Sequence, residues 1–231
     1  MKLIPKWVQH QFDRVVTPVA NGLIVTGIHP NTLTTIGFAT LLASAVAFAL
    51  GYIRVGGALL LLSGGLDMLD GKVARGGGTL SAFGAFYDST LDRVGEGALF
   101  TGIAWYFMQG GLRPDLVQWG VLSALVGLGS GLIVSYARAR AEGLDLECKV
   151  GIVQRAERII GLGAPTMFFG AGTQGILLFG IVTVLALLSV FTVVQRVVHV
   201  YRITRAVPME SRATAPRVPA LVDAEEGRNR E

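Results

Sequence analysis

Long apolar stretches alternate with short polar segments along the whole of this chain. Six of these stretches approach or exceed the length that a helix needs to cross a bilayer. They are predicted at residues 32–50, 55–69, 83–108, 117–136, 159–170 with some extension, and 175–200. Most of them lack the polar face that a core helix of a soluble protein presents to water. The pattern therefore predicts an all-α integral membrane protein with six transmembrane helices.

The two ends of the chain differ from this apolar middle. Residues 1–19 mix apolar and charged side chains and predict a juxtamembrane amphipathic helix, although a simple lead-in fits equally well. No uninterrupted apolar core of a secretory signal is expected there. Residues 204–231 contain Pro208, Pro216 and Pro219 among charged residues, which predicts a disordered tail. One membrane domain is thus expected at residues 20–203.

Basic residues predict the orientation, because cytoplasmic loops retain an excess of Lys and Arg. The segments expected on one side carry Lys2, Lys6, Arg14, Lys72, Arg75, Arg138, Arg140, Lys149, Arg155 and Arg158. The opposite loops offer only Arg54 and Arg113. We therefore expect a plasma membrane protein with both termini and the Asp-rich segment in the cytoplasm. The net charge of +4 follows from these loops, and no basic stripe with interleaved aromatics predicts a nucleic-acid partner.

Four carboxylates lie against or within apolar sequence, where each is costly unless compensated. On helices, Asp67 and Asp70 would share one face, and so would Asp88 and Asp92. Carboxylates this close raise one another's pKa values unless cations hold them ionised. The simplest interpretation is a divalent metal site, with room for two ions. The single Cys148 excludes an intrachain disulfide and offers no soft-metal site.

The carboxylates belong to a longer pattern. It reads Asp67-x-x-Asp70-Gly71-x-x-Ala74-Arg75, then eight residues, then Gly84-x-x-x-Asp88-x-x-x-Asp92. The pattern resembles the signature of the CDP-alcohol phosphotransferases, with every signature residue at its expected spacing. Upstream, Pro30-Asn31-x-x-Thr34 is similar to the start of that family's first span. The resemblance covers about residues 20 to 200. It implies a six-span, commonly dimeric enzyme of phospholipid synthesis, with two Mg²⁺ or Mn²⁺ ions at a cytoplasmic active site.

The resemblance also implies roles for individual residues. Asp67, Asp70 and Asp88 would be the principal metal ligands, and Asp92 both a further ligand and the general base. The residues expected around the CDP group are Asn31, Thr34, Asp67, Gly71, Ala74, Arg75 and Gly84. Simpler alternatives remain open: an Asp92–Arg93 ion pair, Arg75 as a positive-inside anchor, packing at Gly84 and an N-cap at Asn31.

A second cluster of charged residues bears on the acceptor, the alcohol that would receive the phosphatidyl group. If Arg138, Arg155 and Arg196 converge, they would bind a dianionic phosphate, so the acceptor would itself be a phosphate ester. The stretches around Arg138 and Arg155, followed by Gln195-Arg196, resemble the inositol-phosphate-using branch of the family. That branch is expected to have Lys where this chain has Arg138. Ordinary positive-inside loop content is the alternative for the cluster, and Arg158 is expected to form an ion pair with Glu142 or Glu157.

The expected reaction transfers a phosphatidyl group from CDP-diacylglycerol to inositol 1-phosphate, with CMP released. The lipid donor would enter from the membrane and the acceptor from the cytoplasm. Glycerol 3-phosphate is the alternative acceptor, because relatives that use it carry a similar arginine stretch. A divalent cation channel or transporter is the alternative of another class. It would explain the four aspartates but not Gly71, Ala74 and Arg75 at fixed offsets.

Overall fold

The computed structural model describes the backbone of residues 6–205 and the side chains of residues 16–205. Within that part of the chain the fold is entirely helical, as predicted. The α-helices are α1 Lys6–Val25, α2 Pro30–Ala49, α3 Ile53–Gly76, α4 Ala82–Tyr106, α5 Val117–Glu142, α6 Arg155–Phe169 and α7 Ile176–Arg205. Short helical turns at η1 Phe107–Gly111, η2 Pro114–Leu116 and η3 Thr173–Gly175 complete the connections.

Local sequence accounts for where the helices begin. Pro30 occupies the first turn of α2, and the Nδ1 atom of His29 accepts a hydrogen bond from the Asn31 amide at 3.2 Å. Ser81 caps α4 by accepting from the Gly84 amide at 2.9 Å. The cap of α2 is therefore His29, and the N-cap alternative for Asn31 is wrong.

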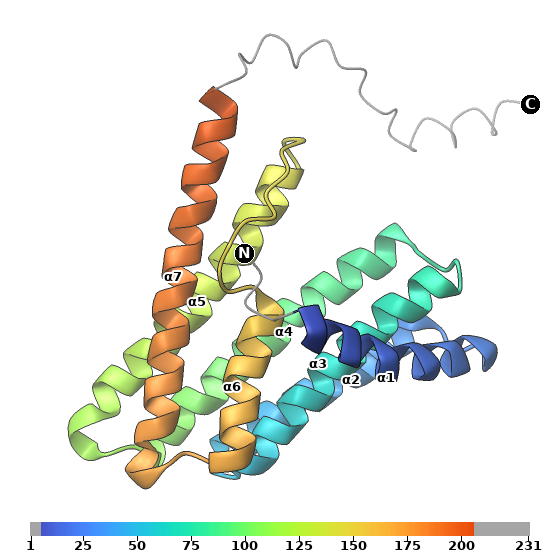
Figure 1. Ribbon diagram of the computed structural model, residues 1–231. Coiled ribbons are helices and arrows are strands. Elements are labelled where there is room, and N and C mark those ends of the chain that lie inside the picture. Colours follow the sequence, from blue (N-terminus) through green and yellow to red (C-terminus); the bar gives the residue numbers. More distant parts are fainter. Residues whose placement is uncertain (1–5, 206–231) are drawn as a thin grey trace, which may run out of the picture.

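The helices form one bundle with a shared apolar core (Figure 1). Helix α2 packs against both α3 and α4, α5 packs against α7, and α6 packs against α3. The fully buried side chains at the centre are Phe48, Leu60, Ile103, Phe107, Leu178 and Val182. In Figure 1, α1 lies across the other helices rather than along them, and it contacts α3.

Small residues allow α3 and α6 to approach closely. A methyl group added at Gly57 would lie 2.6 Å from the Met167 amide and 2.8 Å from the Gly163 carbonyl oxygen. A methyl group added at Gly163 would in turn lie 3.2 Å from the Gly57 carbonyl oxygen. Gly57 and Gly163 therefore serve helix packing.

Many large apolar side chains on the outside of the bundle are exposed, which fits a surface that faces lipid. Within the described residues, three segments have the length and apolar character to cross a bilayer: Pro30–Ala49, Pro114–Glu142 and Thr173–Arg205. The protein is therefore a membrane protein. Helices α3 and α4 carry charged residues and α6 has only 15 residues, so length and composition alone do not mark these three as spans.

Several helices are longer than the predicted spans. Helix α3 continues to Gly76 and α5 to Glu142, so Lys72, Arg75, Arg138 and Arg140 lie on helices rather than in loops. Arg155 and Arg158 likewise open α6. At the ends, the boundary expected after residue 19 falls inside α1, and the expected tail lies outside the described residues beyond Arg205.

Candidate active site

Three of the four predicted aspartates converge. Asp67 and Asp70 come from α3 and Asp88 comes from α4, and their carboxylate oxygens lie within 4.8 Å of one another. Helix α2 brings them together because it packs against both α3 and α4. The i, i+3 spacing places Asp67 and Asp70 on one face of α3, as expected from helix geometry.

Thr34 of α2 holds the most buried of these carboxylates. Its hydroxyl donates a hydrogen bond to the Oδ2 atom of Asp70 at 2.7 Å, and the Asp70 side chain is buried. The donated proton fixes the direction in which Asp70 presents its other oxygen. Thr34, expected beside the nucleotide, therefore lies directly against the aspartate cluster.

The donor set suits a hard divalent cation. The Oδ1 atom of Asp88 is buried and has no hydrogen-bond partner among the described residues. A buried carboxylate oxygen without a donor is costly, and a bound cation removes that cost. Clustered carboxylate oxygens are the ligands that Mg²⁺ and Mn²⁺ prefer. Asp67, Asp70 and Asp88 therefore fit the metal that the sequence predicts.

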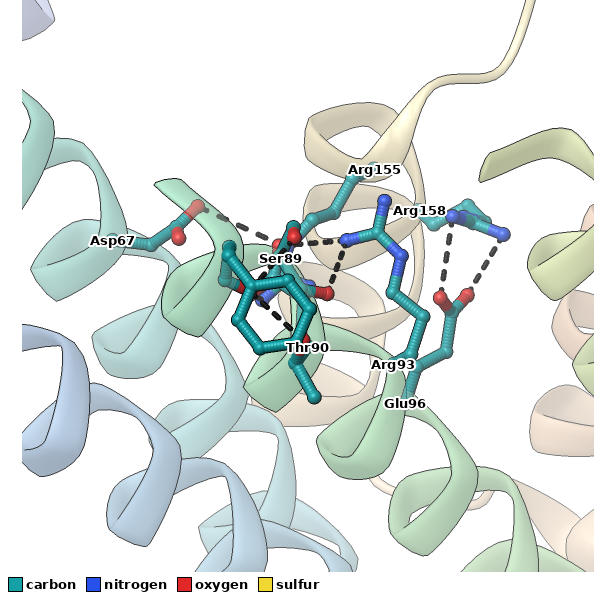
Figure 2. A network of polar contacts seen from close by, with 9 residues as sticks. Asp67, Ser89, Thr90, Arg93, Glu96, Arg155 and Arg158 are labelled. Carbon is teal, nitrogen blue, oxygen red and sulfur yellow. Dashed lines mark hydrogen bonds and ion pairs between the residues drawn. The ribbon is translucent and has the colours of Figure 1, made fainter. Parts of the chain in front are cut away.

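Asp92 lies beside this cluster and contacts Arg155 and Arg93, two arginines that are labelled in Figure 2. Its Oδ1 atom is 2.6 Å from Nη2 of Arg155, and its Oδ2 atom is 3.4 Å from Nη1 of Arg93. Arg155 also reaches toward the cluster, with Nε 3.8 Å from Oδ2 of Asp67. The Arg93 alternative is thus present, but Arg155 makes the shorter contact with Asp92.

The small residues of the signature make room for their polar neighbours. A methyl group added at Gly71 would lie 3.4 Å from both terminal nitrogens of Arg75, so the guanidinium lies over this glycine. A methyl group added at Gly84 would lie 3.2 Å from the Oδ1 atom of Asn31. Ala74 follows Gly71 on α3 and is half-buried. The structure thus brings Asn31 to Gly84 and Arg75 to Gly71.

A cavity of about 820 Å³ opens beside the aspartates. Its lining includes Asp67, Asp88 and Asp92, and all three predicted acceptor arginines: Arg138, Arg155 and Arg196. The arginines are held differently. Arg138 forms an ion pair with Glu142 at 2.8 Å, whereas buried Arg196 donates to the carbonyl oxygens of Val134 and Val150. The predicted arginines therefore border one cavity, each with a partner from the protein.

Arg158 has a different partner from the two that we expected. Its Nη1 atom lies 2.7 Å from Oε1 of Glu96, and both side chains are buried or nearly so, at 8% and 12% exposed. Glu157 instead belongs to the capping box of α6. Glu96 is the site residue that sequence reasoning missed. Its signal was the spacing, because it lies one turn after Asp92 on the same face of α4.

Comparisons with known proteins agree with this geometry. The family model for CDP-alcohol phosphatidyltransferase matches residues 27–201. The chain is 40% identical, over 189 residues, to the archaetidylinositol phosphate synthase of Methanothermobacter thermautotrophicus, covering 82% of this chain and 90% of that protein.

Solved structures of one further protein are also similar. The phosphatidylinositol phosphate synthase of Mycobacterium tuberculosis with CDP-DAG bound has a TM-score of 0.68 and 33% identity, covering 80% of this chain and 92% of that chain. The same enzyme in complex with manganese and citrate has a TM-score of 0.70 and 33% identity, with coverages of 80% and 88%.

Proposed function

Because this chain belongs to the CDP-alcohol phosphatidyltransferase family, we propose that it transfers the phosphatidyl group of CDP-diacylglycerol to inositol 1-phosphate. The products are phosphatidylinositol phosphate and CMP. The observation that carries this proposal is the convergence of Asp67, Asp70 and Asp88 at a cavity that arginines also line. Cation and anion sites side by side suit a reaction between a nucleotide-linked lipid and a phosphate ester.

The metal site is assigned to Asp67, Asp70 and Asp88, with Asp92 as a further ligand for a second ion. The unpartnered Oδ1 atom of Asp88 and the 4.8 Å span of the ligand atoms support this assignment. These carboxylates would hold Mg²⁺ or Mn²⁺, whose charge would offset that of the pyrophosphate and of the departing CMP. The manganese complex of the Mycobacterium tuberculosis relative supports the same ion for this chain.

The cytidine diphosphate is assigned to the signature residues next to the metal site. These residues are Asn31, Thr34, Asp67, Gly71, Ala74, Arg75 and Gly84. Arg75 supplies a planar, permanently charged donor for a phosphate. Gly71 has no side chain and leaves the space that the Arg75 guanidinium occupies. The relative whose structure contains CDP-DAG supports this donor.

Asp92 is assigned as the general base. It takes the proton of the acceptor hydroxyl as the oxygen–phosphorus bond forms, while the bond to CMP breaks. Arg155, at 2.6 Å from Asp92, holds that carboxylate in one orientation. The cavity of about 820 Å³ is large enough to admit the acceptor beside both residues.

Three arginines are assigned to the phosphate of the acceptor: Arg138, Arg155 and Arg196. They border one cavity, and guanidinium groups bind dianionic phosphates in a bidentate manner. Both relatives described above act, by their names, in making inositol phosphate lipids, which favours inositol 1-phosphate over glycerol 3-phosphate.

We also propose that α2 to α7 cross the membrane six times, with the active site and both termini at the cytoplasmic face of the plasma membrane. Helix α3 contains 24 residues, which at 1.5 Å per residue is roughly 36 Å and exceeds a hydrocarbon core of about 30 Å. The exposed apolar side chains would then contact lipid or, in a homodimer, a second copy of the chain.

The test is an assay of CMP release by the purified protein. We expect CMP from CDP-diacylglycerol, Mn²⁺ and inositol 1-phosphate, none after chelation by EDTA, and recovery when the metal is restored. Asp88→Asn should abolish turnover, because it removes a ligand charge from the cluster while preserving the shape of the side chain.

The same assay with glycerol 3-phosphate in place of inositol 1-phosphate tests the acceptor. CMP release with glycerol 3-phosphate but not inositol 1-phosphate would reject the proposed acceptor. Full turnover by folded Asp88→Asn protein, or turnover unaffected by EDTA, would reject the metal site.

A further inference from the structure

Two ion pairs link α4 to α6, and Figure 2 shows Glu96 facing Arg158 in one of them. The first joins Asp92 to Arg155 at 2.6 Å, and the second joins Glu96 to Arg158 at 2.7 Å. Glu96 follows Asp92 by four residues on α4, and Arg158 follows Arg155 by three on α6. Each helix therefore presents its two charged residues on one face, and the two acids follow the same order as the two arginines.

The Glu96–Arg158 pair is the more deeply enclosed of the two. The second arm of Arg158 also contacts Glu96, with 3.4 Å between Nη2 and Oε2. Apolar side chains lie on one side of the pair, where a small cavity is lined by Leu99, Phe100 and Leu185, and the cavity of about 820 Å³ lies on the other. Two contacts in such surroundings define one orientation of the side chains more strictly than a solvated ion pair would.

A third helix closes over this pair at a glycine. A methyl group added at Gly131 of α5 would clash with Nη1 of Arg158 and would lie 2.6 Å from Oε1 of Glu96. Only a residue without a side chain leaves room for both charged groups at this point. The pair is thus a junction of α4, α5 and α6.

These two ion pairs link α4 to α6 through their side chains. Among the described residues the backbones of α4 and α6 do not pack closely together, whereas α6 packs on α3 and α4 packs on α2. Packing on α3 sets the position of α6, and the long side chains between α4 and α6 contribute to its rotation relative to α4. Arg155, at the start of α6, depends on that rotation to reach Asp92.

We propose that the Glu96–Arg158 pair is a positioning element that aligns Arg155 with Asp92 for the transfer reaction. This inference rests on the proposed function, in which Asp92 is the base. Glu96 and Arg158 do not act on substrate in this account. They hold α6 at the rotation in which Arg155 orients the Asp92 carboxylate, and catalysis is sensitive to misplacements of about 1 Å.

Gly131→Ala tests this idea without removing any charge. The added methyl group meets only the tips of flexible side chains, so we expect the pair to move while the helices remain folded. Gly129→Ala on the same helix is the matched control, because a methyl group there has nothing within 4 Å. Both changes replace glycine by alanine within α5, so their effects on helix propensity are equal.

We expect kcat of Gly131→Ala to fall about tenfold or more, because the base loses its alignment. Its affinity for the first Mn²⁺ ion, measured by electron paramagnetic resonance, should match that of wild type, because the Asp67, Asp70 and Asp88 cluster is left intact. Gly129→Ala should match wild type in both measurements. Wild-type kcat in folded Gly131→Ala would overturn the proposal.

The double variant Glu96→Gln with Arg158→Gln provides a second route if Gly131→Ala does not fold. Removing both charges avoids leaving one buried and unpaired. We expect a folded protein with reduced kcat and unchanged KM for CDP-diacylglycerol. A rise in the acceptor KM alone, with kcat intact, would overturn a role of the pair in aligning Asp92. If wild-type protein releases no CMP at all, the proposed function fails instead.

Discussion

Thr34 is the residue on which the geometry of Asp70 depends. Its hydroxyl donates to Oδ2 of Asp70 at 2.7 Å, across from α2 to α3. Groups that orient a metal ligand affect binding almost as much as the ligand itself, because they set the direction of its free lone pairs. A single hydroxyl group on α2 therefore bears on metal binding by α3.

Thr34→Ala should weaken Mn²⁺ binding about tenfold, measured by electron paramagnetic resonance in the absence of nucleotide. The physical reason is that Asp70 loses its side-chain hydrogen-bond donor and rotates more freely. Thr40→Ala is the control, since Thr40 lies on the same helix but donates to the Ile36 carbonyl oxygen. Unchanged affinity in folded Thr34→Ala would contradict the orienting role.

At the scale of elements, the contact between α3 and α6 determines where Arg155 lies relative to Asp67. Gly57 and Gly163 let the two helices approach until the backbone of one meets the backbone of the other. Because Asp67 lies on α3 and Arg155 on α6, their 3.8 Å separation depends on this close approach. Helix packing and the charge arrangement of the site are thus coupled.

Gly57→Ala should destabilise the protein by about 1–3 kcal/mol, because the added methyl group meets backbone atoms that must shift. Thermal unfolding in detergent measures the effect as a lower Tm. Gly180→Ala on α7 should leave Tm at or above the wild-type value, since nothing lies within 4 Å of the added methyl group. Equal Tm values for the two variants would mean that the α3–α6 interface relaxes freely.

At the scale of the whole molecule, the turns between helices alternate between two ends of the bundle. Tyr52 lies in the exposed turn between α2 and α3, and Thr79 lies in the exposed turn between α3 and α4. The 24 residues of α3 separate them, which is roughly 36 Å. If α3 crosses the bilayer as proposed, these two turns face opposite compartments.

Cysteine labelling of intact cells tests this topology. In a Cys148→Ala background, Tyr52→Cys should react with a membrane-impermeant maleimide, whereas Thr79→Cys should react only after permeabilisation. The direction follows from Lys72 and Arg75 near the second turn, which favour the cytoplasm. Labelling of both cysteines from outside, or of Thr79→Cys alone, would reject the proposed orientation.

Features that depend on local periodicity were predicted correctly from the sequence. The helical character of the chain follows from its apolar runs, and the family follows from eight residues at fixed spacing. Helix ends were predicted less accurately, since α3 and α5 continue past the apolar residues to Gly76 and Glu142. Charged residues at the end of a helix resemble a loop in a hydropathy pattern, although they continue the same hydrogen-bonded ladder.

Partners across helices were decided only by the tertiary structure. Arg158 pairs with Glu96 rather than with Glu142 or Glu157, and Arg155 reaches Asp92. The sequence by itself determined the set of charges and the helices that carry them, because spacing along one helix defines which residues share a face. It did not determine which charges meet, because long side chains can reach several partners. The separation and rotation of the packed helices select among them.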